Sequence, residues 1–442
     1  MRDEWLKMNM GDLGRAIGAG DIDPLDLTRT YLDAIEAHPF ADRIYARVTE
    51  GRALSEARAA SDRARAGQRL GVLDGVPISW KDLFDTAGVA TEAGSALLKG
   101  RVPVEDAEVL RNATAAGLVC LGKTHMSELA FSGLGLNPVT ATSPCVNNHA
   151  AVSGGSSSGA ATSVAFGLAA CGIGSDTGGS VRIPSAWNDL VGLKTTAGRV
   201  SLKGVVPLVA RFDTVGPLCR TVEDAALMLA ALEGEQAVDL RGARLKGVRL
   251  LVLENGLQHC RDQPFAGFDS ALGRLMDGGA AVTHAHLPHV DEALALSGVL
   301  FTTEAYATWR DEIDARPDLM YPEIRDRFRA GAQFSGVEFV QAWQRLKAIR
   351  EEFHALTAGY DAVVLPSSPI MPPNVDRLLT DHDYYVEENL WALRNTRIGN
   401  LMGSCGLSLP TGLPSAGIML LGAPMGEERL LRLGAAAEAV LS

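Results

Sequence analysis

Hydrophobic residues recur at helical spacing in several stretches of the chain. Asp23-Pro24 is a helix cap followed by a proline in the first turn, and Leu25, Leu32 and Ile35 continue from it along one helix face. Similar patterns predict further helices over 51–66, 105–116, 157–170 and 266–277.

Short apolar runs bounded by glycine or proline alternate with these helices. The runs cover 76–80, 118–122, 248–253, 281–284, 362–365 and 417–421. Strands of this length that alternate with helices are typical of α/β proteins, so the pattern predicts an α/β fold.

A helical insertion over about 290–356 lies between the later strands. Its clearest helix begins at a capping box, Ser335-x-x-Glu338, and continues with apolar residues at helical spacing. We expect this insertion to form a lid or a wall of the functional site. No linker-like run and no internal repeat divides the chain, so we predict a single domain over residues 1–442.

Charge and cysteine content exclude several classes of protein. The chain carries 41 Lys and Arg against 53 Asp and Glu, a net charge of −12, which is the wrong sign for a nucleic-acid-binding surface. The six cysteines form no C-x-x-C pair and no disulfide-like framework. Neither a signal peptide nor an apolar membrane span is visible, so we expect a cytoplasmic protein with no membrane anchor.

Two Gly/Ser clusters are the strongest chemical signal in the sequence. They are SGGSSSG at 153–159 and GSDTGGS at 174–180, on either side of the helix predicted over 157–170. Glycines let consecutive backbone N–H groups converge on a bound oxyanion. Flexible turns would have the same composition, so neither cluster alone identifies a site.

Gly155-Ser156-Ser157-Ser158-Gly159 also fits a nucleophile elbow with Ser157 as the nucleophile. This interpretation needs a preceding strand, which the sequence lacks, and a later histidine, for which the candidates are His354 and His382. A phosphate-binding loop is weaker still, because neither of the usual glycine spacings fits.

A lysine ends one of the predicted strands, in GVPISWKD, and completes a more specific pattern. This segment, with GGSSSGAATSVAFGLAACGIGSDTGGSVRIPSAW and GLKTTAGRVS, resembles the signature region of the amidase signature family of serine hydrolases. The resemblance is strong over about 70–220. Lys81, Ser156 and Ser180 have the 75- and 24-residue separations of that family's Ser-cisSer-Lys triad.

The resemblance implies that Ser180 is the nucleophile, that Ser156 relays protons from a cis peptide, and that Lys81 is the terminal base. Lysine accepts a proton only when neutral, so the site must lower its pKa from about 10.4, which apolar neighbours favour. The implied oxyanion hole consists of the backbone N–H groups of Thr177, Gly178, Gly179 and Ser180.

Further residues are candidates for substrate contact. Phe131, Ser132 and Gly133 resemble a family segment that lines the acyl side of the pocket, although a helix end followed by a turn would look the same. Asp176 and Arg182 flank the second cluster, where an ion pair would hold the loop in shape. The rival interpretation makes Arg182 a clamp for a substrate carboxylate.

His284-x-His286-x-x-His289 suggests a metal site at first sight. No cysteine or suitably spaced carboxylate completes the ligand set, and Pro288 interrupts the element. We therefore expect no metal here, and the resemblance implies no cofactor.

Taken with the fold of the family, these residues predict a large mixed, mainly parallel sheet covered by helices on both faces. The expected activity is hydrolysis of a small-molecule amide through an acyl-enzyme on Ser180. One alternative is the glutaminase component of a tRNA-dependent amidotransferase, its A subunit, and another is a catalytically silent scaffold. A homodimer is left open, and the sequence does not name the amide.

Overall fold

An eleven-stranded sheet runs through the computed structural model, which describes residues 2–441. Its strands lie in the order β1-β3-β2-β4-β6-β5-β10-β11-β9-β7-β8. The strands are β1 (Tyr45–Val48), β2 (Pro77–Lys81), β3 (Val119–Thr124), β4 (Cys171–Ser175), β5 (Val191–Lys194), β6 (Val215–Cys219), β7 (Arg249–Leu253), β8 (Ala281–Ala285), β9 (Ala362–Pro366), β10 (Cys405–Pro410) and β11 (Gly417–Gly422).

The sheet is mixed, as the sequence predicted, but it is not mainly parallel. Parallel pairing is confined to β3–β2–β4 and to β9–β7–β8, and the other neighbouring pairs are antiparallel. Among the antiparallel neighbours, β10 and β11 follow each other in the chain and are joined by a short connection, which needs no crossover helix.

Helices make up about half of the remaining chain. They are α1 (Arg2–Trp5), α2 (Met10–Ala19), α3 (Pro24–Ala37), α4 (Ala41–Ile44), α5 (Glu50–Arg65), α6 (Glu108–Ala115), α7 (Ser158–Ala165), α8 (Arg182–Trp187), α9 (Val222–Glu233), α10 (Asp262–Asp277), α11 (Pro288–Ala295), α12 (Thr303–Ala315), α13 (Pro322–Arg329), α14 (Gly336–Thr357), α15 (Val375–Thr380), α16 (His382–Leu401) and α17 (Glu427–Leu441).

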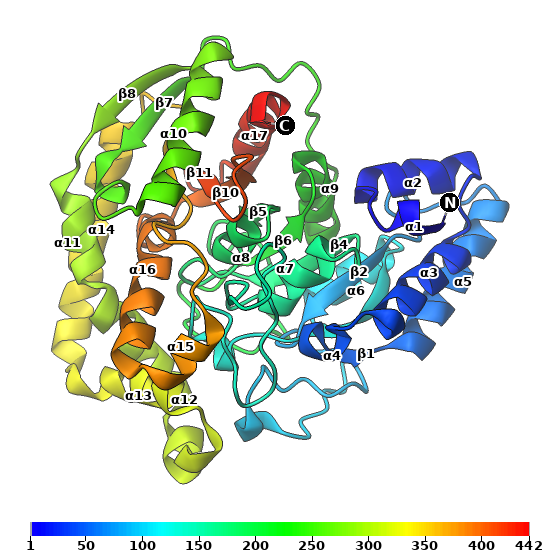
Figure 1. Ribbon diagram of the computed structural model, residues 1–442, viewed down its shortest axis with the longest axis horizontal. Helices are drawn as coiled ribbons and strands as arrows, with labels where there is room; N and C mark the ends of the chain where they lie inside the picture. The colour runs from blue at the N-terminus through cyan, green and yellow to red at the C-terminus, as the bar shows by residue number, and fades with distance from the viewer. Residues whose placement is uncertain (1, 442) are drawn as a thin grey trace.

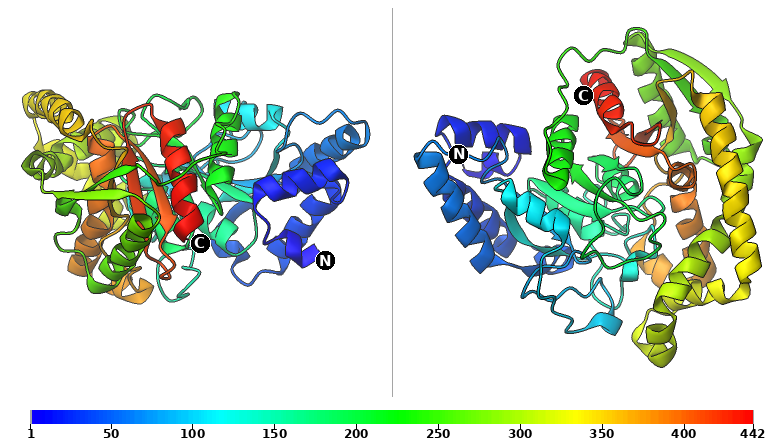
Figure 2. Two further views of the ribbon diagram at one scale, coloured as in Figure 1. Left: turned by 90° about the horizontal axis from the view of Figure 1, so that it is seen from above. Right: turned by 180° about the vertical axis from the view of Figure 1, so that it is seen from behind.

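Helices cover both faces of the sheet, as predicted. On β10, the side chain of Leu407 packs against Gly434 of α17, whereas Gly406 faces Arg182 of α8. Successive residues of a strand face opposite sides, so α17 and α8 lie on opposite faces. The N-terminal helices gather at one end of the molecule and the insertion α11–α14 at the other (Figures 1 and 2).

The predicted helical insertion is present between β8 and β9. Its longest helix, α14, begins at Ser335, whose side chain accepts a hydrogen bond from Glu338 N while the Glu338 carboxylate accepts one from Ser335 N. The capping box read from the sequence is therefore formed. The helix predicted over 157–170 ends earlier, at Ala165, because Gly167 has a positive φ of 76° that a continuing helix does not allow.

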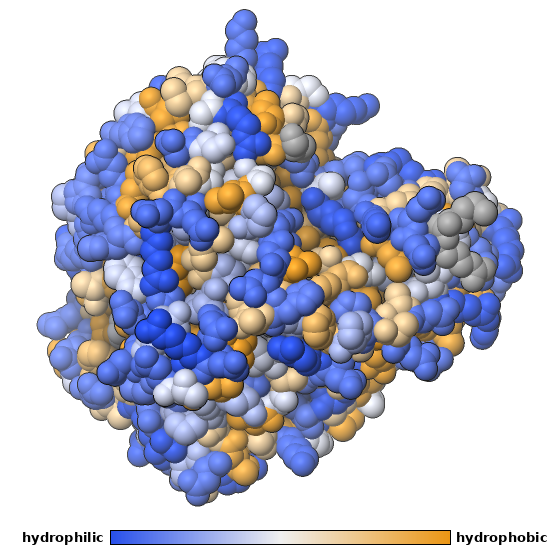
Figure 3. Space-filling model, in the orientation of Figure 1, coloured by the Kyte–Doolittle hydropathy of each residue, from blue (hydrophilic) through white to orange (hydrophobic). Residues whose placement is uncertain are grey.

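Hydrophilic residues predominate on the face drawn in Figure 3, and the hydrophobic ones are interspersed in small groups. Across residues 2–441, no helix combines the length and the apolar character that crossing a membrane would require.

Candidate active site

Lys81 lies at the end of strand β2 and is fully buried. Its Nζ is 2.7 Å from Ser156 Oγ and 2.8 Å from Ser175 Oγ, and both serines are buried as well. Ser175 ends β4, which runs parallel to β2, so the two strand ends deliver their side chains to one place. Lys81 and Ser156, predicted to act together, are brought into contact.

Burial lowers the pKa of Lys81 to about 7, even though the nearby carboxylates of Asp176 and Asp213 raise it. A lysine with this pKa is largely neutral just above pH 7, so its nitrogen can accept a proton there. Ile78 and Trp80, which the sequence suggested as its apolar neighbours, are buried, but successive strand residues face opposite sides, so both lie on the other face of β2 from Lys81.

The segment that carries Ser156 lies against the segment that carries Ser180. The Gly155–Ser156 peptide bond is cis, as the resemblance implied. The next residue, Ser157, donates its backbone N–H to the carbonyl of Ser180 at 3.3 Å. Gly155 fits closely against Gly135, since a Cβ added to it would lie 2.6 Å from the Gly135 nitrogen.

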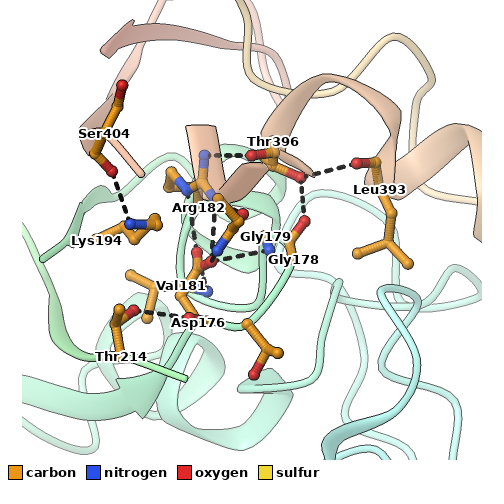
Figure 4. Close-up of polar contacts among 12 residues, drawn as sticks. Asp176, Gly178, Gly179, Val181, Arg182, Lys194, Thr214, Leu393, Thr396 and Ser404 are labelled. Carbon is orange, nitrogen blue, oxygen red and sulfur yellow. Dashed lines mark hydrogen bonds and ion pairs between the residues drawn. The ribbon is translucent and has the colours of Figure 1, made fainter. Parts of the chain in front are cut away.

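A buried ion pair shapes the loop before Ser180 (Figure 4). Asp176 and Arg182 are both fully buried and meet at 2.9 Å. The same carboxylate accepts the backbone N–H groups of Gly179 (2.9 Å) and Val181 (3.1 Å). Burial alone would raise the pKa of Asp176, but the charge and hydrogen bonds of Arg182, the charge of Lys194 and a hydrogen bond from Asn400 lower it to about 2.

Arg182 has no donor left for a substrate. Its Nε and Nη2 donate to Asp176, Nη1 donates to Thr396 O at 2.7 Å, and Nη2 also donates to Asn400 Oδ1 at 2.6 Å. Nη1 additionally contacts Met419 Sδ. Of the two interpretations of Arg182, the geometry favours the ion pair and not the carboxylate clamp.

The predicted oxyanion hole needs one correction. Gly179 donates its N–H to Asp176 and is therefore already engaged. Within residues 2–441, the N–H groups of Thr177, Gly178 and Ser180 have no hydrogen-bond acceptor. These three donors, in place of the four expected, are the ones available to an oxyanion.

Ser180 opens into a small chamber of about 20 Å³. The chamber is lined by Ala130, Phe131, Ser132, Thr177, Gly178, Ser180, Leu208, Phe301, Arg327, Leu393 and Arg397. Phe301, Arg327 and Arg397 also line a larger cavity of about 340 Å³, so the two spaces are contiguous. The insertion α11–α14 contributes Arg327, and it thus forms a wall of the site.

Of the three residues of the 131–133 segment predicted to contact substrate, two line the chamber and one does not. Phe131 and Ser132 line the chamber. Gly133 does not: its N–H donates to Asn389 Oδ1 at 2.9 Å, and an added Cβ would lie 2.7 Å from Leu393. Its role in the structure is to let this turn pack against α16.

Sequence reasoning missed Ser175, Arg327 and Arg397. Ser175 lies inside the second Gly/Ser cluster, so its place in the sequence already indicated that it lies near the site. The two arginines come from α13 and α16, where a helical arginine is usually solvated, and nothing in the sequence distinguishes them from the others.

The nucleophile-elbow alternative is wrong. Ser157 is buried, and its hydroxyl donates to the Ser175 carbonyl at 3.2 Å. His354 contacts Met402 O, and His382 pairs with Glu323 at 2.7 Å. Neither of the two candidate histidines therefore contacts Ser157.

The His284, His286 and His289 cluster assembles no ligand set. His286 lies 3.3 Å from Asp291, and within residues 2–441 no group of three or more His, Cys, Asp or Glu side chains is arranged to hold a metal ion.

Comparisons with known proteins agree with this geometry. The Amidase family profile matches residues 26–431. The chain is 36% identical, over 88% of its length and 87% of the other protein, to a 2-amino-5-chloromuconic acid deaminase of Comamonas testosteroni. It is 31% identical, over 98% of its length and 96% of the other protein, to the A subunit of the glutamyl-tRNA(Gln) amidotransferase of Anaeromyxobacter sp. (strain K).

Solved structures give the same picture. The crystal structure of an amidase superposes with a TM-score of 0.88 at 30% identity and covers 98% of this chain and 100% of its own. The peptide amidase of Stenotrophomonas maltophilia superposes with a TM-score of 0.81 at 26% identity, over 98% of this chain and 97% of its own. The chain therefore belongs to the amidase family, and it is a hydrolase of the carbon–nitrogen bond in small-molecule amides.

Proposed function

We propose that hydrolysis proceeds through an acyl-enzyme on Ser180, with Lys81 and Ser156 moving the protons and with ammonia or an amine as the leaving group. The observation that carries the proposal is the contact of Lys81 Nζ with Ser156 Oγ at 2.7 Å, together with a Lys81 pKa of about 7. The relative from Comamonas testosteroni is named for removing an amino group from 2-amino-5-chloromuconic acid, which supports ammonia as the leaving group here.

Acylation begins with a proton transfer. Neutral Lys81 accepts the Ser156 hydroxyl proton while Ser156 accepts the proton of Ser180. Ser180 Oγ then forms a bond to the amide carbon. Ser175, whose Oγ lies 2.8 Å from Lys81 Nζ, positions the lysine amine.

The tetrahedral intermediate carries its negative charge on the former carbonyl oxygen. The free N–H groups of Thr177, Gly178 and Ser180 stabilise it, and losing one such donor typically costs about 2.7 to 4 kcal/mol. Collapse breaks the carbon–nitrogen bond, and the proton held by Lys81 returns through Ser156 to the leaving nitrogen. Water then attacks the acyl ester by the same proton route and frees Ser180.

The glutaminase components of tRNA-dependent amidotransferases are the second candidate, because the chain matches one of them over nearly its whole length at 31% identity. Such a component would release ammonia from glutamine in company with a partner. Ammonia release by the single chain from a non-glutamine amide would therefore favour the free-standing amidase.

The test measures ammonia release from a panel of aliphatic, aryl, carboxylated and urea-type amides, with glutamine included. Ser180→Ala removes the nucleophile and should lower turnover by about 10⁴-fold or more while the fold persists. Ser158→Ala is the matched control, since this neighbouring hydroxyl donates to the His125 carbonyl and faces neither Lys81 nor the chamber.

Substantial turnover by folded Ser180→Ala would overturn the assignment of the nucleophile. Equal losses in Ser158→Ala and Ser156→Ala would overturn the proton relay, because only Ser156 contacts Lys81.

A further inference from the structure

Two arginines face the reacting end of the site. Arg327 of α13 and Arg397 of α16 line both the chamber that contains Ser180 and the larger cavity outside it. Among residues 2–441, neither guanidinium has a carboxylate within 4 Å. Both side chains are partly buried, and charged groups withdrawn from water are normally paired, so two arginines without a carboxylate partner at a cavity favour an anionic ligand.

The contacts that these arginines do make leave most of their N–H groups free. Arg327 donates once, to the Phe131 carbonyl at 3.0 Å, and its guanidinium lies 4.4 Å from the centre of the Phe131 ring. Arg397 lies 5.8 Å from the centre of the Phe301 ring and makes no hydrogen bond within the described part of the chain. An arginine carries five N–H donors, so both side chains can still bind a ligand.

The two positive charges also act on each other. Burial lowers the pKa of Arg327 to about 10, and burial together with the charge of Arg327 lowers the pKa of Arg397 to about 9. A bound anion would favour the charged form of both arginines, since it supplies an opposite charge.

The acidic side chains nearby do not fill this role. None of the residues that line the chamber is acidic. In the outer cavity, Glu323 is paired with His382 at 2.7 Å and Asp326 with Arg325 at 2.8 Å. The charged side chains that line the chamber are therefore both positive, although the whole chain carries a net charge of −12.

The planar guanidinium matches the two oxygens of a carboxylate. We propose that the substrate is a small amide with a carboxylate near the amide group, and that Arg327 and Arg397 bind this carboxylate while Ser180 attacks the amide carbon. The inference deepens the proposed function and rests on it. Because both arginines line the same chamber as Ser180, the carboxylate and the amide belong to one compact molecule.

The same geometry selects against a positive charge on the substrate. An ammonium group beside the carboxylate, as in glutamine, would meet two cations and no unpaired carboxylate. We therefore expect glutaramate, which is glutamine without its amino group, to bind better than glutamine itself.

The experiment uses a fluorophosphonate that labels Ser180 and asks which small amides protect it. The probes are glutaramate, its neutral counterpart glutaramide, and glutamine. In the wild-type chain, glutaramate should protect Ser180 at a concentration about tenfold lower than glutaramide or glutamine. A difference of this size is expected because charge-assisted hydrogen bonds to the carboxylate strengthen binding by about this factor.

Variants assign the selectivity to the two arginines. Arg327→Met and Arg397→Met should each narrow the gap between glutaramate and glutaramide to about twofold, while Arg327→Lys and Arg397→Lys should keep part of it. Arg329→Met is the matched control on α13, since Arg329 pairs with Asp314 and neither residue lines either cavity. Labelling at the wild-type rate without a protectant shows that a variant is folded.

The outcomes separate this inference from the proposed function. If Ser180 is not labelled at all, the nucleophile assignment fails. If Ser180 is labelled but glutaramate protects no better than glutaramide, or if no probe protects, the carboxylate site is refuted. If the difference in protecting concentration between glutaramate and glutaramide persists in both Arg→Met variants, the carboxylate site is likewise refuted. If glutamine protects as well as glutaramate, the selection against an ammonium group is refuted.

Discussion

The protonation of Lys81 sets the pH at which the proposed mechanism operates. Its pKa, lowered by burial to about 7, means that the base is protonated in acid and neutral above this value. We expect kcat/KM for a neutral amide to rise about tenfold per pH unit below pH 7 and to level off above it. The measurement is a pH–rate profile between about pH 5 and 9.

Ser158→Ala should show the same midpoint, because that hydroxyl does not contact Lys81. A profile that stays flat across this range would contradict a lysine base whose pKa is near 7, whatever the absolute rate.

The Asp176–Arg182 ion pair leads to a second prediction about single residues, which concerns the stability of the fold. Arg182→Met leaves the buried Asp176 carboxylate without its cation, and breaking such a pair typically costs about 3 to 5 kcal/mol of unfolding free energy. Denaturant unfolding measures the loss. The double variant with Asp176→Asn should cost less than the sum of the two single changes, since it leaves no unpaired charge. Simple additivity would mean that the two side chains are not coupled.

Sequence reasoning at the residue scale succeeded where spacing carried the information. Lys81 and Ser156 were expected in contact, and they are. The ion pair expected between Asp176 and Arg182 is also formed. Sequence reasoning failed for Arg327 and Arg397, whose side chains line the cavity, because spacing does not tell which way a helical arginine points. All three are arginines on helices, and only the packing of α8, α13 and α16 distinguishes them.

At the scale of elements, the strands bounded by clear turns and rich in branched residues were predicted, among them β2, β7 and β9. The strands β4, β5 and β6 were not, although they lie at the centre of the sheet beside the site. Their sequences are CGIGS, VGLK and VGPLC, short and rich in glycine, so they show neither alternation nor high strand propensity. Pairing direction was also missed, because hydrophobic pattern does not encode register between distant strands.

The glycines that make β4 hard to predict as a strand are needed for its packing against α7. A Cβ on Gly172 would lie 2.4 Å from the backbone oxygen of Ala160, which cannot move without shifting the helix. Gly172→Ala should therefore lower the unfolding free energy by about 1 to 3 kcal/mol. Gly273→Ala is the control: this glycine is exposed inside α10 with nothing within 4 Å, so alanine should stabilise by about 1 kcal/mol. An unchanged unfolding free energy in Gly172→Ala would mean that α7 shifts to accommodate the added methyl group.

The whole molecule brings together two parts of the chain that are distant in sequence. Lys81, Ser156 and Ser180 come from the region around β2 and β4, and Arg327 and Arg397 come from α13 and α16, beyond β8. One sheet runs beneath both regions and joins their strands through β6, β5, β10 and β11. A ligand held between the serine and the arginines would therefore link the two ends of the sheet.

This continuity predicts how the chain unfolds with and without ligand. We expect a single thermal transition, since no strand of the sheet can separate without breaking pairing along it. In the Ser180→Ala variant, glutaramate at about 100 times its Kd should add about 2.7 kcal/mol to the unfolding free energy and shift that entire transition upward. Calorimetry of Ser180→Ala with glutaramate, and with glutaramide as the control, measures both effects. Two separate transitions, of which glutaramate moves only one, would show that the arginine-bearing region and the serine-bearing region unfold independently and that the single-domain prediction is wrong.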